Sequence, residues 1–326
     1  MRKLWIAGVL SGLLLLGACG DPSSEPESAP PPPAPAPART SPSSTTHQRP
    51  AATPDADGGA NEGADGGAGT RTEAPAKGPS SSPTVLYLGD SLAMENQKVL
   101  GGLMRDELKA RYTSTPYSGT TPCDYLEGTG KDSLVPPKDK AAALVRTLRP
   151  DFVVLQFWGN AWDYTPCMDG IAYDKARDKY FARYTADARR LTDQIAGAAD
   201  GARPEIVWVL QGPDPMTPDR VRRVNAIYER QAAASGDLLA DAGKAVSPAS
   251  ARYTWTQYLP CTAYEREHTP YCTQPGSGRT ALHRDDDYLH FCMAPTTTTP
   301  KPCPVRSPGI LRISRAITGA VAAQLD

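Results

Sequence analysis

Short apolar runs alternate with longer amphipathic stretches along most of this chain, and few folds are compatible with that order. A continuous apolar run of this kind is typical of a strand that is buried on both faces. Strands separated by helices are joined by right-handed crossovers, which makes the strands parallel and covers the sheet on both sides. The pattern predicts strands at residues 84–88, 113–117 (the weakest), 152–158 and 206–210, and helices at residues 141–148, 173–199, 218–234 and 307–325.

Apolar residues recur at intervals of three or four within the helical stretches, which places them on one face of each helix. The sets are Val99, Leu100, Leu103, Met104 and Leu108 after the first strand; Phe181, Tyr184, Ala188, Leu191 and Ile195; and Ile310, Ile313, Ile317 and Val321 near the end. Such faces are expected to pack on the sheet. In a sheet of this class, functional loops gather at the carboxyl ends of the strands.

The first nineteen residues have the form of an export signal. Arg2 and Lys3 precede an apolar run that is too short to be a spanning helix. Its ending, Leu-Gly-Ala-Cys at Cys19, resembles the lipobox of bacterial lipoproteins, in which the cysteine becomes the lipidated first residue of the mature chain. The resemblance implies an exported, outward-facing protein held on the membrane by acyl chains on Cys19. An ordinary signal peptide with a chance cysteine is the alternative.

Residues 20–82 are rich in Pro, Ala, Gly, Ser and Thr with scattered acids. A segment of this composition cannot bury enough apolar surface to offset its ordering entropy, so a disordered tether is expected here. Residues 83–326, about 240 in all, suit one α/β domain. The formal net charge of −1, with acids and bases interspersed, gives no support to nucleic-acid binding.

Six cysteines remain once Cys19 is set aside. An even number in an exported chain favours three disulfides. Pairing near neighbours gives Cys261–Cys272 and Cys292–Cys303, which leaves Cys123–Cys167, although the sequence does not choose among the possible pairings. Zinc is the competing interpretation because three histidines lie among the last four cysteines. No Cys-x-x-Cys or His-x-x-x-His spacing accompanies them, so we expect no metal.

A candidate nucleophile follows the first strand in Gly-Asp-Ser-Leu, with Ser91 at the start of the next helical stretch. At this position a hydroxyl lies at the mouth of the sheet, and backbone N–H groups of the helix end can stabilise an oxyanion. Helix capping alone is the alternative explanation for a serine here. A serine nucleophile also requires a base.

Four histidines could supply that base. His47 lies in the predicted tether, and His268 lies in a Pro-containing stretch bounded by cysteines, which we interpret as a loop. His290 follows Asp287 by three residues, so the carboxylate could bind Nδ1 of the imidazole and leave Nε2 for Ser91. A solvated acidic run beside an incidental histidine is the alternative.

Together, Gly-Asp-Ser-Leu near the start and Asp-x-x-His near the end resemble the GDSL or SGNH hydrolase family. The resemblance implies a flavodoxin-like, three-layer α/β/α fold and an esterase, lipase, carbohydrate deacetylase or O-acyltransferase. It also implies Ser91, Asp287 and His290 as catalytic residues. Gly119 and Asn160 match the glycine and asparagine that join the Ser91 backbone N–H in the family's oxyanion hole. In the common pattern one residue separates glycine from asparagine and Asp follows, whereas here Gly159 adjoins Asn160.

The predicted Cys123–Cys167 bond would tie the Gly119 and Asn160 loops together, and Cys292–Cys303 would fix the loop that carries His290. Stiffening of surface loops is an equally simple role for both bonds. Trp158, Trp162 and Tyr164 could line an acyl or sugar pocket, although packing is the commoner role for at least two of them.

The sequence therefore predicts a serine esterase that forms an acyl-Ser91 intermediate and needs no cofactor. Small acyl or acetyl esters, including those on extracellular glycans, are the expected substrates. An O-acyltransferase of cell-envelope glycans shares the same intermediate and stays open as an alternative. A non-catalytic, surface-anchored binding domain is the alternative of another class.

Overall fold

A computed structural model of the 326-residue chain describes residues 82–129, 131, 133–160, 166–294 and 302–325. The predicted signal peptide, Cys19 and residues 20–81 of the predicted tether lie outside these ranges and stay predictions. None of the described helices is both long and apolar enough to cross a bilayer.

Five parallel strands form the central sheet. They are β1 (Thr84–Gly89), β2 (Arg111–Ser114), β3 (Phe152–Gln156), β4 (Glu205–Val209) and β5 (Leu238–Ala240), and their order is β2-β1-β3-β4-β5. This is the flavodoxin-like order, in which the chain leaves β1 for one neighbour, β2, and later returns to the other side as β3. In sheets of this order, ligands bind beyond the carboxyl ends of the strands on either side of the point where the order reverses, here β1 and β3.

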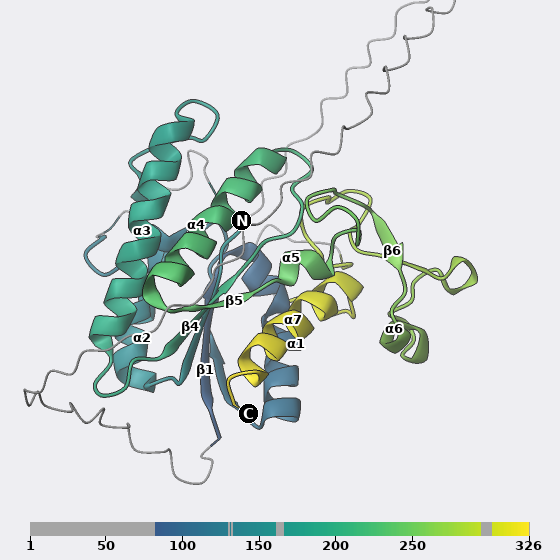
Figure 1. The fold of residues 1–326 in the computed structure, drawn as a ribbon, viewed down its shortest axis with the longest axis horizontal. Coiled ribbons are helices and arrows are strands. Elements are labelled where there is room, and N and C mark those ends of the chain that lie inside the picture. The colour runs from purple at the N-terminus through teal and green to yellow at the C-terminus, as the bar shows by residue number, and fades with distance from the viewer. Residues whose placement is uncertain (1–81, 130, 132, 161–165, 295–301, 326) are drawn as a thin grey trace, which may run out of the picture. The chain divides into compact units, whose positions relative to one another are not determined.

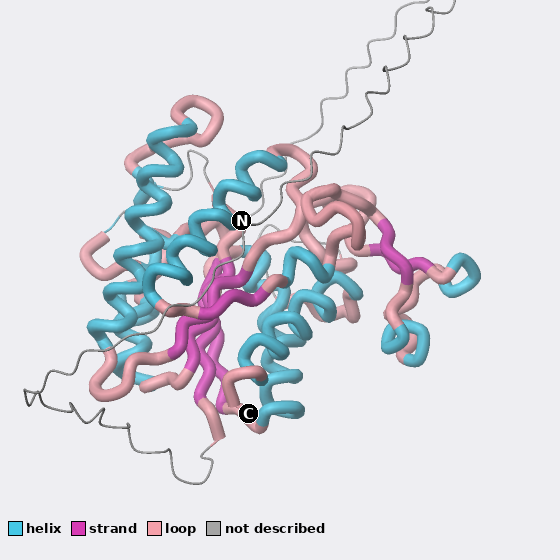
Figure 2. Tube along the Cα trace, in the orientation of Figure 1, coloured by secondary structure: helices cyan, strands magenta, loops and turns pink. Residues whose placement is uncertain are grey.

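Helices cover both faces of the sheet, as Figure 1 and Figure 2 show. One layer contains α1 (Ser91–Leu108) and α7 (Pro308–Ala322), and the other contains α2 (Ala141–Leu148), α3 (Arg177–Ala198) and α4 (Pro218–Ser235). The short helix α5 (Ala242–Ala245) lies beside α7. The predicted three-layer α/β/α sandwich is confirmed.

Successive side chains of each strand point to opposite faces of the sheet and so contribute to two hydrophobic cores, one under each helix layer. In β1, Val85 and Tyr87 join the buried cluster of α1 and α7, whereas Leu86 and Leu88 join the cluster on the opposite face. All four side chains are fully buried. Because successive residues of a strand point to opposite faces, one continuous apolar run serves both layers.

A small antiparallel pair lies outside the central sheet, formed by β6 (Tyr258–Pro260) and β7 (Arg279–Ala281). Helix α6 (Ala263–Glu267) follows β6 directly. The segment read from sequence as a loop around His268 thus contains regular structure. Four 3₁₀ turns complete the described elements, at Pro122–Tyr125, Pro137–Asp139, Pro166–Met168 and Pro275–Ser277.

Several element boundaries differ from the sequence-based expectation. Strand β3 ends at Gln156 rather than at residue 158, and α7 spans Pro308–Ala322 rather than residues 307–325. The edge strand β2 occupies Arg111–Ser114 rather than residues 113–117, because pairing with β1 already begins at Arg111, whose N–H donates to the Pro83 carbonyl at 2.8 Å. Helix α3 begins at Arg177 rather than residue 173, since Tyr173 lies in a preceding turn and packs its ring edge-on against Tyr180. Strands β5, β6 and β7 and the short helices α5 and α6 were not predicted.

The three disulfides are Cys123–Cys167, Cys261–Cys272 and Cys292–Cys303, so the predicted pairing is confirmed. Among the described residues, one group of His, Cys, Asp and Glu side chains is close enough to hold a metal, namely Cys123, Asp124 and Cys167. Both of its sulfurs are used in a disulfide. The histidine-and-cysteine zinc site considered from sequence is therefore replaced by disulfides.

Candidate active site

The candidate site is built where β1 gives way to α1. Asp90 is the N-cap of α1, and its Oδ1 accepts a hydrogen bond from the Leu92 N–H at 3.0 Å. Ser91 is the first residue of the helix and is only partly buried. The cap therefore holds the serine at the carboxyl end of β1, next to the point where the strand order reverses.

Gly89 permits this junction because its backbone passes unusually close to the neighbouring strand. Its φ is +157°, and a Cβ built there would lie 2.0 Å from the carbonyl oxygen of Gln156 at the end of β3. The next N–H, that of Asp90, donates to the same oxygen at 3.2 Å. A side chain at Gly89 would thus separate the two strand ends that carry the site.

A chain of hydrogen-bonding groups joins Ser91, His290 and Asp287. The His290 Nε2 lies 3.1 Å from the Ser91 Oγ, and the His290 Nδ1 lies 3.0 Å from the Asp287 Oδ2. A carboxylate only accepts, so Nδ1 carries a hydrogen, and neutral imidazole then has Nε2 free to accept the serine proton. The structure thus brings together residues 199 positions apart in the arrangement of a nucleophile, base and orienting acid.

Asp287 also fixes the backbone of its own loop. Its Oδ1 accepts from the N–H groups of Leu289 at 3.2 Å and of His290 at 3.1 Å. Burial alone raises the pKa of this carboxyl, but the hydrogen bond and charge of His290 and these N–H groups outweigh burial and lower the pKa to about 2. Asp287 therefore stays ionised beside the ring.

The imidazole of His290 is a strong base in this setting. Burial alone lowers its pKa, but the hydrogen bond to Asp287 and the negative charges of Glu95, Asp287 and Asp90 raise the pKa to about 9. The ring is then mostly protonated at neutral pH in the resting site. The fraction of His290 in the neutral form that can accept the Ser91 proton increases as pH rises toward 9.

Asp90 connects the serine to the strand opposite. Its Oδ2 accepts from the Trp158 N–H at 2.6 Å, just beyond the end of β3. Burial raises the pKa of Asp90 to about 6, although the Trp158 and Leu92 N–H groups and the charge of His290 oppose this rise. The Asp90 side chain thus has a structural role: its Oδ1 caps α1 next to Ser91, and its Oδ2 links α1 to the segment after β3.

Asn160, the predicted oxyanion donor, lies at the same edge of the sheet. Its Nδ2 donates to the Thr120 carbonyl oxygen at 3.0 Å and approaches the Asp90 Oδ2 at 3.3 Å. Donation to an oxyanion would require release of the longer of these contacts. Gly119, the other predicted donor, precedes Thr120 in a turn with φ +75°, so its loop contacts Asn160 directly. Their roles in an oxyanion hole stay predictions.

The Cys123–Cys167 bond joins the segment after β2 to the segment after β3, which are the loops of Gly119 and Asn160. Trp158 is 8% exposed, and the Arg220 guanidinium lies 4.2 Å from its ring centre, so packing is its observed role. Trp162 and Tyr164 lie outside the described residues, and their predicted part in a pocket stays a prediction.

Two further side chains contact the peptide bond between His290 and Phe291; Glu95 was not predicted from sequence, and His283 was considered only as one of the histidines near the last cysteines. Glu95, on α1, accepts from the Phe291 N–H at 3.0 Å. His283 places its Nδ1 3.0 Å from the His290 carbonyl oxygen. Glu95 lies four residues after Ser91, so the two side chains share one helix face. His268, by contrast, stacks on Tyr264 with ring centres 3.8 Å apart.

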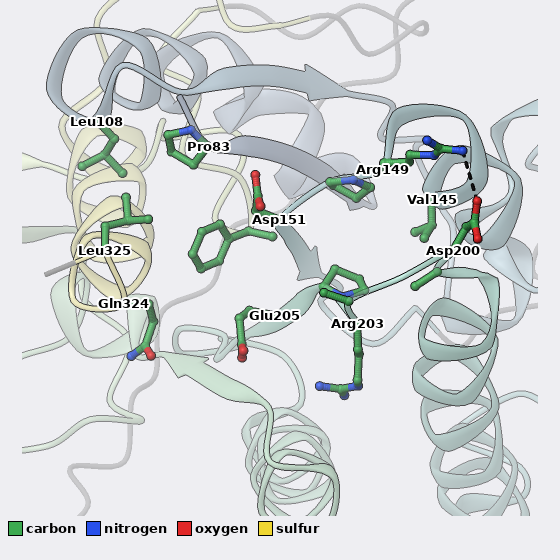
Figure 3. A pocket seen from close by; sticks show the side chains of 15 residues that line it. Pro83, Leu108, Val145, Arg149, Asp151, Asp200, Arg203, Glu205, Gln324 and Leu325 are labelled. Atoms are coloured by element: carbon green, nitrogen blue, oxygen red, sulfur yellow. Dashed lines mark hydrogen bonds and ion pairs between the residues drawn. The ribbon is translucent and has the colours of Figure 1, made fainter. Parts of the chain in front are cut away.

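A separate hollow of about 950 Å³ opens at the opposite end of the sheet, by the amino ends of the strands (Figure 3). Pro83, Phe152 and Glu205 line it, and Arg149 pairs with Asp200 across 3.1 Å at its rim. Neither serine nor histidine lines this hollow. It therefore does not share the chemistry of the Ser91 site.

No protein-family model matches the chain, and no curated protein matches it. Several solved structures are similar to it. An α/β hydrolase enzyme from the metagenome of Lake Arreo is 15% identical, with a TM-score of 0.40 over 74% of this chain and 96% of its own. The lipase/acylhydrolase from Enterococcus faecalis is 12% identical, with a TM-score of 0.38 over 74% and 96%. A family 3 carbohydrate esterase from Clostridium thermocellum is 13% identical, with a TM-score of 0.39 over 75% and 98%. With identities and scores this low, the chemistry of this chain must be inferred from its own site.

Proposed function

We propose that this protein is a serine esterase of the SGNH type that cleaves small acyl or acetyl esters through an acyl-Ser91 intermediate. The observation that carries the proposal is the contact of Ser91 Oγ with His290 Nε2 at 3.1 Å, backed by Asp287 at 3.0 Å from Nδ1. The resemblance of the Gly-Asp-Ser-Leu and Asp-x-x-His segments to that family supports it.

In the first half of the reaction, Ser91 Oγ attacks the ester carbonyl carbon and its proton passes to His290 Nε2. The tetrahedral oxyanion is stabilised by the Ser91 and Gly119 backbone N–H groups and by the Asn160 amide. The carbon–oxygen bond to the alcohol then breaks, and the alcohol leaves with the proton held by His290. Asp287 stabilises the imidazolium that forms in between.

In the second half, water attacks the acyl-serine. His290 takes a proton from the water and returns it to Ser91 Oγ as the acid is released. Capture of the acyl group by a sugar hydroxyl in place of water would make the same site an O-acyltransferase. Choice between the two depends on which acceptor reaches the acyl-serine.

Exported location and membrane anchoring through Cys19 belong to the proposal as well. They rest on the lipobox-like ending at Cys19 and suggest O-acylated extracellular glycans as natural substrates. Partition of the protein into detergent, lost in Cys19→Ser, tests the anchor. A Cys19→Ser protein that still partitions into detergent would contradict it.

The catalytic part is tested with p-nitrophenyl acetate and the full chain purified in detergent. We expect Ser91→Ala and His290→Ala each to lower kcat/KM on the order of 10³-fold or more. Ser277→Ala is a matched control, because that serine is exposed in the 3₁₀ turn Pro275–Ser277 and bonds only to Gln274 among the described contacts. Equal activity in wild type and Ser91→Ala would instead favour a non-catalytic binding domain. Acyl transfer that replaces hydrolysis when a glycan is added would favour the transferase.

A further inference from the structure

One peptide unit, the bond between His290 and Phe291, is held at both of its polar groups. The His283 Nδ1 lies 3.0 Å from the His290 carbonyl oxygen. Since a carbonyl oxygen only accepts, Nδ1 must carry the hydrogen and His283 is the donor. On the other side, the Phe291 N–H donates to the Glu95 Oε2 at 3.0 Å.

Helix α1 therefore touches the His290 loop at two points. Ser91 and Glu95 are four residues apart and share a helix face. Ser91 Oγ meets the imidazole Nε2 at 3.1 Å, and the Glu95 carboxylate holds the next residue's backbone. Only 5% of Glu95 is exposed, so its carboxylate is committed to this contact.

Burying a carboxylate is costly unless it is compensated. Burial raises the pKa of Glu95 to about 7, while the charge of His290 and the Phe291 N–H oppose that rise. The other charged or titratable groups around the ring are Asp287 on its own loop, Asp90 before α1, and His283. Helix α7 also packs on α1, but its Arg312 pairs with Glu265 and its Arg315 with Glu107. Within the described residues, His290 is thus the cation whose charge acts on Glu95.

We propose that Glu95 is a positioning residue for His290, which holds the ring toward Ser91 through the Phe291 N–H and places a second carboxylate beside the imidazolium. This inference rests on the proposed esterase function. Asp287 orients the His290 ring through Nδ1. Glu95 holds the backbone after His290 through the Phe291 N–H and adds a negative charge near the ring. A neutral side chain of the same shape would keep the first effect and lose the second.

Glu95→Gln separates these effects, because its amide oxygen can still accept from the Phe291 N–H. The test compares kcat/KM from pH 5 to 10 on p-nitrophenyl acetate, using the full chain and correcting for spontaneous hydrolysis. We expect the acidic limb to move to lower pH by about one unit and the alkaline plateau to fall about three- to tenfold. Glu107→Gln removes the same charge from the exposed end of α1 and should change neither quantity.

The fold should survive the change. With its pKa raised from 4.5, Glu95 contributes stability below that value, and the contribution is lost as pH rises through about 7. Above pH 7, Glu95→Gln should therefore melt at or above the wild-type temperature. If Glu95→Gln fails to fold, Glu95→Asp is used instead, because it keeps the charge on a shorter side chain. For Glu95→Asp we expect a lower alkaline plateau of kcat/KM and an acidic limb within about 0.3 pH units of wild type.

A folded Glu95→Gln with the wild-type limb and plateau, or a Glu95→Asp with the wild-type plateau, would overturn this inference. In that case loss of activity in Ser91→Ala would leave the esterase proposal intact. Full activity in Ser91→Ala would overturn the esterase proposal itself, so the two failures are distinguishable.

Discussion

Replacement of Asp287 by asparagine removes the orienting charge while keeping the shape of the side chain. The Asn Oδ1 can still accept from the Leu289 and His290 N–H groups, so the loop should keep its backbone. The Asn Nδ2 would then face His290 Nδ1 as a donor. The ring must respond by placing its hydrogen on Nε2, where it cannot accept the Ser91 proton.

The magnitude follows from the setting of His290. A rise in its pKa from 6.5 to about 9 corresponds to roughly 3 kcal/mol in favour of the imidazolium, to which Asp287 contributes the hydrogen bond. Loss of that support and of the right tautomer should lower kcat on the order of 10³- to 10⁴-fold. The pKa of His290 should fall as well.

The assay is p-nitrophenyl acetate hydrolysis at pH 9, where wild-type His290 is substantially in its base form, together with NMR titration of the histidines. Asp286→Asn is the matched control, since that exposed carboxylate is one residue away and pairs with Arg284. It should keep wild-type activity. Activity of Asp287→Asn within about tenfold of wild type, or an unchanged His290 pKa, would refute the reasoning.

Three further outcomes are expected. Gly89→Ala should yield little folded protein, because its Cβ would meet a carbonyl oxygen at 2.0 Å, whereas Gly102→Ala, whose Cβ has no neighbour within 4 Å, should fold normally. Removal of the Cys292–Cys303 bond should cost about 2–4 kcal/mol of stability and lower kcat, whereas removal of Cys261–Cys272, with the same separation of 11 residues, should spare kcat. Activity measured as kcat/KM should rise with pH toward about 9, as His290 loses its proton. Thermal stability should fall over the same range, because a raised pKa makes the stabilising contribution of His290 complete below pH 6.5, and this contribution is lost as pH rises through about 9. A flat or acid-favoured pH profile, normal folding of Gly89→Ala, or equal loss of kcat for both disulfides would contradict these expectations.

The central sheet was predictable because its strands are continuous apolar runs that serve two cores. Leu86 and Leu88 face one helix layer and Val85 and Tyr87 the other, so the sequence pattern reports burial on both sides. Strand β5 was missed because only Leu238–Ala240 pair, too short a run to stand out. The β6–β7 pair was missed for the same reason, since three-residue strands with Pro260 and Arg279 carry no alternation.

The candidate site was partly predictable. A serine nucleophile needs a base, which limited the candidates to a few histidines. The spacing of Asp287 and His290 lets the carboxylate bind Nδ1, so the contact of His290 with Ser91 was expected. Glu95 could not be identified, because its role depends on the Phe291 N–H of a loop 196 residues away. Nothing local in the sequence records that approach.

The most direct measurement is to trap the acyl group. The full chain is mixed with p-nitrophenyl acetate, quenched in acid during turnover and digested, and the acylated peptide is mapped by mass spectrometry. The account predicts an acetyl group on Ser91 that is absent from Ser91→Ala. Turnover at the wild-type rate with no acyl group on Ser91, or an acetyl group found at equal level in Ser91→Ala on another residue, would contradict it.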